Sequence, residues 1–364
     1  MLRNARIAVA CVIGAYFLLA GAKAGAPAGG APQARALTPN RPEIAPGYHL
    51  LKTVPLGAAP GGGEYFDYLT ADSDGRRIYV SHGTEVVVVD ADSFAKVGTI
   101  GGLQRCHGIA LVRELGKGFI TDGDGEKVVV FDIASLKVTG EIKTEKDADS
   151  IIYDPASKHI FAFNGDPNSA TVIDPATATV VKRLEMGGGP EFAVADGKGT
   201  VYNNIEDKNE VVAIDSKALT IKARWPVAPA GGPTAITMDR EHRRLFSAGR
   251  NPQFLVMMDA DSGKVLQSAK ISGGVDAAVF EPETANVFVS TRDGMIHIFH
   301  EGSPEKLSEV ETLKTELGAK TMALDTKTHN LYVSTAEFAA PEAGKANARR
   351  RPVPGTFHLL IYGR

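Results

Sequence analysis

Residues Arg77–Phe94 read RIYVSHGTEVVVVDADSF, and this stretch decides the fold because the chain repeats it. Its first run, Ile78–Ser81, combines β-branched and aromatic residues, which is typical of a strand. A short turn containing glycine follows, and a second apolar run, Val86–Val89, ends on Asp90. The pattern predicts an antiparallel hairpin. Similar phrases return six more times along the chain.

The repeats align on the aromatic residue of the first run, and successive aromatics are 40 to 44 residues apart. The seven residues are Tyr79, Phe119, Phe161, Tyr202, Phe246, Phe288 and Tyr332. A period of this size, made of short β-branched runs and polar turns, indicates four-stranded blades. The sequence therefore predicts an all-β fold, a seven-bladed β-propeller of four-stranded antiparallel blades over residues 47–364.

The two ends of the repeat region predict how the ring closes. The last repeat stops at Arg364, directly after its third strand. The segment Tyr48–Leu56, YHLLKTVPL, has the composition of a strand and precedes the first complete repeat. We expect this N-terminal strand to complete blade seven, because that pairing would remove an open sheet edge.

Acidic residues end many of the predicted strands, at two repeating positions. One set ends the innermost strands: Asp72, Asp154, Asp196, Asp239, Glu281 and Asp325. The other ends the third strands: Asp90, Asp132, Asp174, Asp215 and Asp259. Short carboxylates accept backbone N–H hydrogen bonds in such turns, so we interpret both sets as turn formers and not as metal ligands.

The N-terminus has the pattern of a secretory signal peptide over residues 1–24. Arg3 and Arg6 precede a 16-residue apolar stretch, Ile7–Ala22, which leads into a small-x-small cleavage motif. A retained membrane anchor is the alternative, but a spanning helix needs about 20 apolar residues. We expect a periplasmic or secreted protein with no transmembrane segment after cleavage.

The remaining composition describes an acidic, exported chain. Ala, Pro and Gly dominate residues 25–46, which predicts a flexible tether. The whole chain of 364 residues has a net charge of −3, and cleavage would remove three cations and no acid. Without a basic stripe we do not expect a nucleic-acid partner.

Cys106 would be the single cysteine left after cleavage, which excludes an internal disulfide. We interpret it as a small residue that fills space in the core. We expect a monomer.

One insertion interrupts the repeats, in blade seven at residues 335–356. Its Pro, Ala and Gly content predicts a mobile loop. The basic triplet Arg349–Arg351 within it is typical of a solvated surface, and the sharper alternative is a docking site for an acidic partner.

A ring of polar residues is predicted at one mouth of the central channel. The position five residues before each innermost-strand turn is equivalent in all blades. These residues are Asp67, His107, Asp149, Glu191, Thr234, Asp276 and Lys320. Six of the seven are ionisable, where small or apolar residues would be the ordinary choice for packing.

The polar residues of the mouth are divided by sign. Blades one to four supply mainly carboxylates and histidines, and we predict a divalent cation (Ca²⁺, Mg²⁺ or Zn²⁺) held by hard O and N ligands. The predicted metal ligands are Asp67, His107, Asp149 and Glu191. Blades five to seven supply cations that could hold a carboxylate or phosphate. The predicted ligand-binding residues are His82, Arg250, Asp276, Arg292 and Lys320. The alternative is a polar channel lining whose charges pair with one another.

The strings IYVSHGTEVVVVDADS and LYVSTA resemble the YVTN repeat of YncE-like seven-bladed propellers, over residues 48–364. The resemblance implies an exported bacterial propeller. Related propellers form the N-terminal domain of nitrous oxide reductase, the haem domain of cytochrome-cd-type nitrite reductases and lactonase-type enzymes. Because these branches differ in chemistry, the resemblance implies no single activity. The C-x-x-C-H motif of a covalent haem is absent from the sequence.

Two functions remain open from the sequence. The first is an exported binding or scaffold propeller that presents its charged mouth to a small anionic or metal-bearing ligand, or to a protein partner. The alternative is a metal-assisted lactone hydrolase or lyase, in which a cation polarises a carbonyl and His107 or Glu191 moves the proton. No nucleophile elbow is present, which disfavours nucleophilic serine catalysis.

Overall fold

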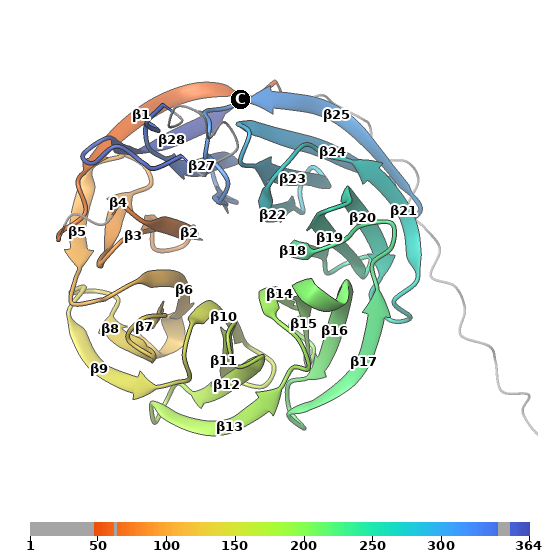
Figure 1. The fold of residues 1–364 in the computed structure, drawn as a ribbon, viewed down its shortest axis with the longest axis horizontal. Helices are drawn as coiled ribbons and strands as arrows, with labels where there is room; N and C mark the ends of the chain where they lie inside the picture. The colour runs from red at the N-terminus through yellow and green to blue at the C-terminus, as the bar shows by residue number, and fades with distance from the viewer. Residues whose placement is uncertain (1–46, 62–63, 341–349) are drawn as a thin grey trace, which may run out of the picture. The chain divides into compact units, whose positions relative to one another are not determined.

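A computed structural model describes residues 47–61, 64–340 and 350–364, all within one compact unit, Thr38–Arg364. These residues form seven four-stranded antiparallel sheets arranged around a central axis (Figure 1). The predicted all-β, seven-bladed propeller is confirmed. The predicted signal peptide (1–24) and tether (25–46) lie outside the described residues.

Each blade runs from an innermost strand at the channel to an outermost strand at the rim, in chain order in blades one to six, whereas in blade seven the N-terminal strand is outermost. The innermost strands are β2 (Phe66–Asp72), β6 (Cys106–Val112), β10 (Ala148–Asp154), β14 (Pro190–Ala195), β18 (Pro233–Asp239), β22 (Val275–Glu281) and β26 (Met322–Asp325). The second strands are β3 (Arg77–His82), β7 (Lys117–Asp122), β11 (His159–Asn164), β15 (Thr200–Ile205), β19 (Arg244–Arg250), β23 (Asn286–Thr291) and β27 (Asn330–Thr335).

The outer half of each blade completes the sheets. The third strands are β4 (Glu85–Asp90), β8 (Lys127–Asp132), β12 (Ser169–Asp174), β16 (Glu210–Asp215), β20 (Gln253–Asp259), β24 (Met295–Ser303) and β28 (Phe357–Gly363). The fourth strands are β5 (Lys96–Ile100), β9 (Val138–Lys143), β13 (Thr179–Glu185), β17 (Thr220–Pro226), β21 (Val265–Lys270), β25 (Lys306–Lys314) and β1 (His49–Gly57). Single 3-10 turns, η1 (Arg113–Leu115) and η2 (Glu206–Lys208), are the helical segments of the described chain.

The hydrophobic core lies between neighbouring blades. The repeat aromatics of the second strands are at most 1% exposed. One apolar cluster, for example, joins Ile78 and Val87 of blade one to Leu359 and Ile361 of blade seven. The two middle strands of a blade are buried on both faces, so their sequences are near-continuous apolar runs and not alternating ones.

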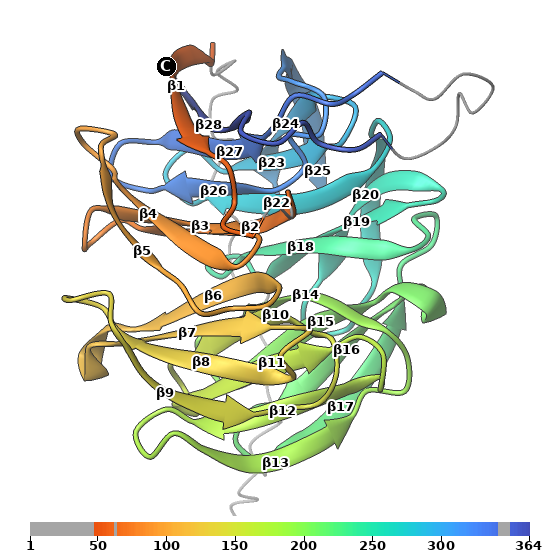
Figure 2. The same ribbon diagram turned by 60° about the vertical axis from the view of Figure 1, so that its left-hand side comes forward.

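The N-terminal strand closes the ring. β1 pairs with β28 in antiparallel register, from His49 opposite Gly363 to Gly57 opposite Phe357. Figures 1 and 2 both show β1 beside β28 close to the C-terminus. The sheet of blade seven therefore combines the two ends of the described chain, as predicted, and β28 is not left as an open edge.

The acidic turn residues form the predicted turns, and four of those on innermost strands also join neighbouring blades. Asp72 accepts the backbone N–H of Gly75 at 2.9 Å, and Asp90 accepts that of Ser93 at 2.8 Å. Each inter-blade pair links a basic side chain to the buried acid of the preceding blade. These pairs are Arg76–Asp325, Arg113–Asp72, Arg243–Asp196 and Arg364–Glu281. The turn motif alone did not indicate this second role.

The predicted mobile loop of blade seven has a paired base. Phe338 and Pro352 form a β-bridge, and the N–H of Ala339 donates to the carbonyl of Arg351 at 2.9 Å. The described ends of the insertion are thus a short antiparallel stem, while residues 341–349, including Arg349, lie outside the described residues. The stem brings Phe338 and residues 350–352 toward the channel mouth.

Two further features concern the chain as a whole. Cys106 is fully buried at the start of β6, as expected for a filler residue, and burial raises the pKa of its thiol to about 12. Among the described residues, the structure contains no helix with the length and apolar character needed to cross a membrane.

Candidate functional site

β-Bulges near the channel mouth carry six of the seven ring residues. In blades one to six the ladder between the innermost and second strands shifts register where the ring residue lies. A bulge re-aims the side chains of the bulged strand. Polar residues of the second strand satisfy the freed backbone groups: the N–H of Asp67 donates to Ser81 Oγ at 2.9 Å, and the N–H of Gly108 donates to Thr121 Oγ1 at 2.8 Å.

The bulges bring Asp67, His107 and Asp149 together, three of the four predicted metal ligands. Nδ1 of His107 lies 2.8 Å from Oδ2 of Asp67 and 2.9 Å from Oδ1 of Asp149. The hydroxyl of Tyr65 donates to Asp67 at 2.8 Å and lies 2.9 Å from the same His107 nitrogen. One ligand atom from each of the three predicted residues lies within 4.8 Å of the others, so the group could hold a metal ion.

The charges of this cluster depend on one another. Burial alone would lower the pKa of His107, but the adjacent Asp149 and Asp67 outweigh burial and raise that pKa to about 9. Burial alone would raise the pKa of Asp67, but Lys320 and His107 hold it well below its usual range. Burial and the nearby Asp67 and Asp149 charges raise the pKa of Tyr65 above its ordinary value, which keeps its hydroxyl protonated.

A chain of ion pairs continues from Asp67 across the channel mouth. The ammonium of Lys320 lies 2.9 Å from Oδ1 of Asp67 and also pairs with Asp276. Asp276 pairs in turn with Arg250, whose other terminal nitrogen lies 2.9 Å from Glu206. The acidic and basic halves of the mouth are therefore joined by direct pairs, so much of the ring is a self-paired lining, as the alternative interpretation of the sequence had it.

Glu191, the fourth predicted metal ligand, lies apart from the cluster. It forms a long ion pair with Arg250, at 4.0 Å. Burial and the charge of Asp149 raise the pKa of Glu191 well above its ordinary value, although Arg250 opposes that shift. The structure therefore does not join Glu191 to His107, the other candidate for proton transfer.

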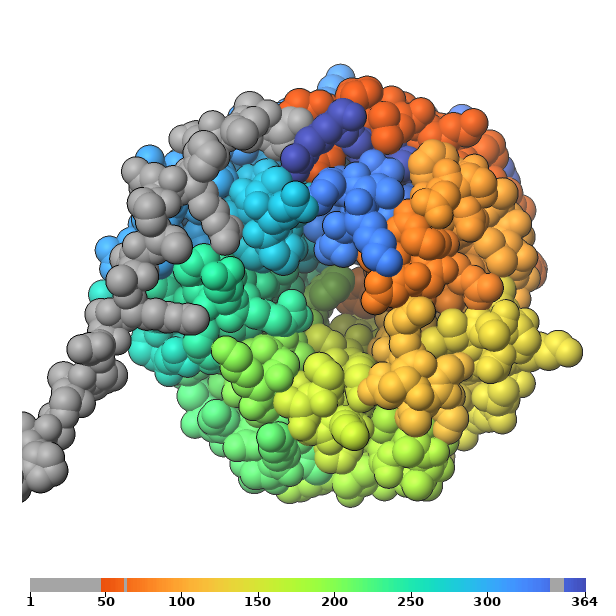
Figure 3. Space-filling view, turned by 180° about the vertical axis from the view of Figure 1, so that it is seen from behind, coloured from red at the N-terminus to blue at the C-terminus, as the bar shows by residue number. Residues whose placement is uncertain are grey.

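Aromatic side chains narrow the channel below the ring. Tyr68 of β2 follows Asp67, and Phe192 of β14 follows Glu191. Their rings meet edge to face across the channel with centroids 4.3 Å apart, and the Tyr68 hydroxyl lies 3.4 Å from Asp149. The space-filling view from behind shows the hollow at the centre of the ring (Figure 3).

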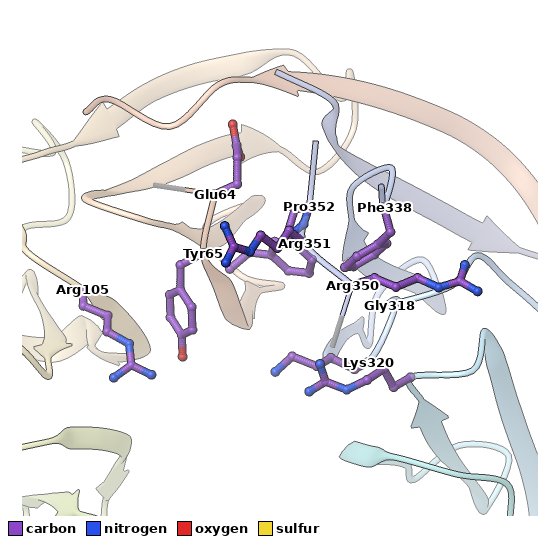
Figure 4. A pocket seen from close by; sticks show the side chains of 11 residues that line it. Glu64, Tyr65, Arg105, Gly318, Lys320, Phe338, Arg350, Arg351 and Pro352 are labelled. Atoms are coloured by element: carbon purple, nitrogen blue, oxygen red, sulfur yellow. The ribbon is translucent and has the colours of Figure 1, made fainter. Parts of the chain in front are cut away.

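A pocket of about 480 Å³ opens at the mouth between blades one and seven (Figure 4). The start of β2 and the stem of the blade-seven insertion supply most of its wall. Gly318 allows the stem to approach, because a Cβ at this position would lie 2.3 Å from Cε2 of Phe338. The lining residues are Glu64, Tyr65, Phe66, Arg105, Arg292, Gly318, Lys320, Phe338, Arg350, Arg351 and Pro352. Five of them are cationic and one is acidic.

The cations of the pocket differ in how far other groups neutralise them. Lys320 is buried between two aspartates, whereas the Arg105 guanidinium stacks over the Tyr65 ring and lies 3.7 Å from both Asp124 and Asp147. Arg351 is exposed, and no carboxylate of the described residues pairs with it. In Figure 4 the side chains of Arg105 and Arg351 extend toward the space around Tyr65, while Arg350 points away.

The predicted ligand-binding residues take different places. Arg292 and Lys320 line the pocket. Arg250 and Asp276 belong to the ion-pair chain beside it. His82 is fully buried: it bonds Glu64 at 2.9 Å and stacks on Phe357, so any part it plays in binding is to position Glu64.

Sequence reasoning missed the pocket residues at the entrance of the innermost strands. Tyr65 and Arg105 each lie two positions before a ring residue, where blades four to seven have glycine. This difference in residue type at equivalent positions was visible in the repeat alignment. The carboxylate of Asp122 fixes the approach to β6 by accepting the N–H groups of Gln104 and Arg105, at 2.9 and 2.8 Å. No comparable pattern in the sequence indicated that the stem of the blade-seven insertion would line the pocket.

Comparisons with known proteins agree on the fold and leave the function open. A family model described as a domain of unknown function, DUF5074, matches residues 68–228. A chain of hydrazine synthase from Kuenenia stuttgartiensis superposes with a TM-score of 0.65 at 13% identity, covering 82% of this chain and 99% of that one. At this identity the likeness concerns the fold alone. No curated protein matches the sequence.

A propeller positions many loops around one opening, and the fold by itself implies no single activity. The narrower resemblance to YncE-like proteins stays a prediction, since the matching family model carries another description.

Proposed function

We propose that this chain is a binding propeller that takes a small organic anion in the basic pocket between blades one and seven. The observation that carries the proposal is the basic lining of the pocket: five of its residues are cationic, Glu64 is its single acidic residue, and Arg351 has no carboxylate partner among the described residues. Glu64 is bonded to His82 and accepts the N–H of Gly355, so both of its oxygens already have partners.

The pocket offers directed hydrogen-bond donors as well as charge. Lys320 has three N–H donors, and its two aspartate partners use two of them. Arginine is suited to carboxylate and phosphate because its planar guanidinium can donate two parallel hydrogen bonds. Arg105 and Arg351 approach the same space from blades two and seven. An anion between them would also bring together two segments that are distant in the sequence.

The apolar part of the lining indicates that the anionic group belongs to a larger organic molecule. Phe66, Phe338 and Pro352 contribute to the same pocket as the cations. A volume of about 480 Å³ lies within the range of about 300–1,000 Å³ that small-molecule sites occupy. A carboxylate or phosphate attached to a ring or short alkyl body would use both parts of the lining.

We also propose that the protein acts outside the cytoplasm, in the periplasm or as a secreted chain. The support is the N-terminal sequence, with its basic start, apolar run and small-x-small motif. Expression of the full chain in bacteria, followed by fractionation and N-terminal sequencing, tests this part. Recovery of the full-length chain in the membrane fraction would favour the retained anchor instead.

Isothermal titration calorimetry tests the binding proposal, with benzoate, citrate and inorganic phosphate as probes. We expect at least one of them to bind, more weakly as salt is added because the attraction is ionic. Arg351→Ala should weaken binding about tenfold or more, since a hydrogen bond to a charged group contributes about 1.5–3 kcal/mol. Arg183→Ala is the matched control: Arg183 is also a half-exposed arginine, but it lies on the outermost strand β13 and pairs with Glu145.

Two outcomes would overturn the proposal. One is the absence of binding by any of the three anions at low salt. The other is equal weakening by Arg351→Ala and Arg183→Ala, which would show that net charge alone matters. Hydrolysis of a lactone by the wild-type chain, abolished by His107→Ala, would replace the binding proposal with the hydrolase alternative.

A further inference from the structure

The nitrogen Nδ1 of His107 faces three oxygen atoms at hydrogen-bond distance. They are Oδ2 of Asp67 at 2.8 Å, Oδ1 of Asp149 at 2.9 Å and Oη of Tyr65 at 2.9 Å. An imidazole nitrogen carries at most one proton, so it can satisfy only one acceptor well. Oδ1 of Asp149 is buried, and its one donor in the described part of the protein is this same His107 nitrogen, which Asp67 shares. Two buried carboxylate oxygens that share a single donor favour a cation between them.

We propose that Asp67, His107 and Asp149 bind a divalent first-row transition metal ion. The spacing of the donor atoms is the first argument. Ligands at about 2.1 Å in octahedral geometry are about 3.0 Å apart along one edge. The two carboxylate oxygens lie 2.8 and 2.9 Å from the imidazole nitrogen, close to that spacing. The two edges that meet at the imidazole nitrogen therefore agree with an octahedral site, and all three donor atoms lie within 4.8 Å of one another.

The donor types narrow the choice of ion. Two carboxylates supply two negative charges, which match a divalent cation when the imidazole is neutral. Ca²⁺ prefers six to eight oxygen ligands at longer distances, and an imidazole nitrogen suits Zn²⁺, Fe²⁺ and related ions better. With one nitrogen and two oxygens, Mn²⁺, Fe²⁺ and Zn²⁺ fit the set, and Mn²⁺ and Fe²⁺ agree best with an octahedral arrangement.

The surrounding residues hold these ligands in place, as second-shell groups do in metal sites. The ammonium of Lys320 donates a hydrogen bond to Oδ1 of Asp67 at 2.9 Å. The other oxygen of that carboxylate, Oδ2, faces His107. The backbone N–H of Asp67 is fixed by Ser81 at 2.9 Å. Tyr65 contacts both Asp67 and His107 and also lines the basic pocket, so the metal site borders the pocket. The proposal stands independently of anion binding.

A second cluster of similar composition, Asp239, His242 and Glu301, does not carry the same argument. Asp239 accepts the N–H groups of Glu241 and His242 at 2.8 and 3.2 Å, which is the ordinary role of a turn carboxylate. His242 Nδ1 bonds the same carboxylate at 2.6 Å. Asp239 and His242 are therefore already paired with each other within one turn, and only Glu301 comes from another strand, β24.

The test measures metal binding directly, on the full chain purified without chelator and then stripped with one. Isothermal titration calorimetry with Mn²⁺ and with Zn²⁺, with Ca²⁺ for comparison, gives affinity and stoichiometry. We expect Mn²⁺ or Zn²⁺ to bind and Asp149→Asn to weaken that binding more than about 100-fold, since even second-shell changes cost 10- to 100-fold. His297→Gln is the matched control, because His297 is also a buried histidine paired with a carboxylate, Glu309, at 2.8 Å.

The proposal fails if neither Mn²⁺ nor Zn²⁺ binds to the wild-type chain, or if Asp149→Asn binds the same number of ions with the same affinity. A loss of one ion per chain in Asp149→Asn, with His297→Gln unchanged, supports it. Should Asp149→Asn not fold, pulsed electron paramagnetic resonance on wild-type protein with Mn²⁺ decides: coupling to a directly bound imidazole nitrogen supports the site, and its absence overturns it.

Discussion

Nη1 of Arg76, in blade one, lies 2.7 Å from Oδ2 of Asp325, in blade seven. The Asp325 side chain is fully buried, whereas Arg76 is 22% exposed and also holds Asp92. This pair crosses the seam at which the first and last blades meet. The strand pairing of β1 with β28 completes blade seven, and Arg76 then fastens the completed blade to its neighbour.

Arg76→Ala should lower the free energy of unfolding by about 2 kcal/mol, because it leaves a buried carboxylate without its charged hydrogen-bond donor. Urea denaturation followed by circular dichroism measures the change. Lys146→Ala is the control, since Lys146 forms an exposed pair with Asp166 and its loss should leave stability unchanged. Equal effects of the two substitutions would contradict the clamp role of Arg76.

The same carboxylate predicts how stability depends on acid. Burial alone would raise the pKa of Asp325, but hydrogen bonds from Thr328, Ser73 and Arg76 outweigh burial and lower it below 3.8. A carboxyl group whose pKa is lower in the folded protein than in the unfolded chain stabilises the fold. The stabilisation is complete at pH values above the pKa of the unfolded chain, and it is lost as the pH falls through the pKa of the folded protein. We expect the melting temperature to fall as the pH drops below about 4.

The matched comparison for this acid dependence is Asp325→Asn, which cannot ionise. It should be less stable than wild type at pH 7, and the difference should shrink as the pH is lowered toward 2. Calorimetric melting at pH 7, 5, 4 and 3 checks both statements. A difference that stays constant over this range would show that the charge of Asp325 is not what stabilises the seam.

Lys320 and Arg351 line one pocket but should affect the protein differently. Lys320→Met leaves Asp67 and Asp276 buried without their shared cation, which should cost about 3–5 kcal/mol of stability. Arg351→Ala should leave stability unchanged and weaken only anion binding, because Arg351 is exposed. Thermal melting without ligand separates the two residues. A stable Lys320→Met variant would mean that the ion-pair chain contributes little to the fold.

The architecture followed from the sequence because its signals are local and repeated. Seven aromatics at one strand position, each with a turn and a second apolar run, leave few alternatives to a propeller. The strand-like segment Tyr48–Leu56, ahead of the first complete repeat, indicated the strand that closes the ring, and β1 does pair with β28. The acidic turn residues were also recognisable, since Asp72 and Asp90 act within three residues of their own position.

The residues of the candidate site could be predicted only in part from the sequence. The repeat register identified the ring and so brought Asp67, His107 and Asp149 into one group, but it also included Glu191, which lies with Arg250. Equivalent positions share a level in the channel, yet the length and direction of each side chain decide which neighbours meet. His82 shows the same limit: its turn lies at the mouth, but stacking on Phe357 buries the ring.

The sequence by itself determined the number of blades, the strand that closes the ring and the level at which charged residues gather, because each depends on the period of the chain. Only the tertiary structure decided which charges neutralise one another and which remain for a ligand. Those contacts join blades one, two and seven across hundreds of residues, as between Lys320 and Asp67, and no local pattern encodes a distance between such segments.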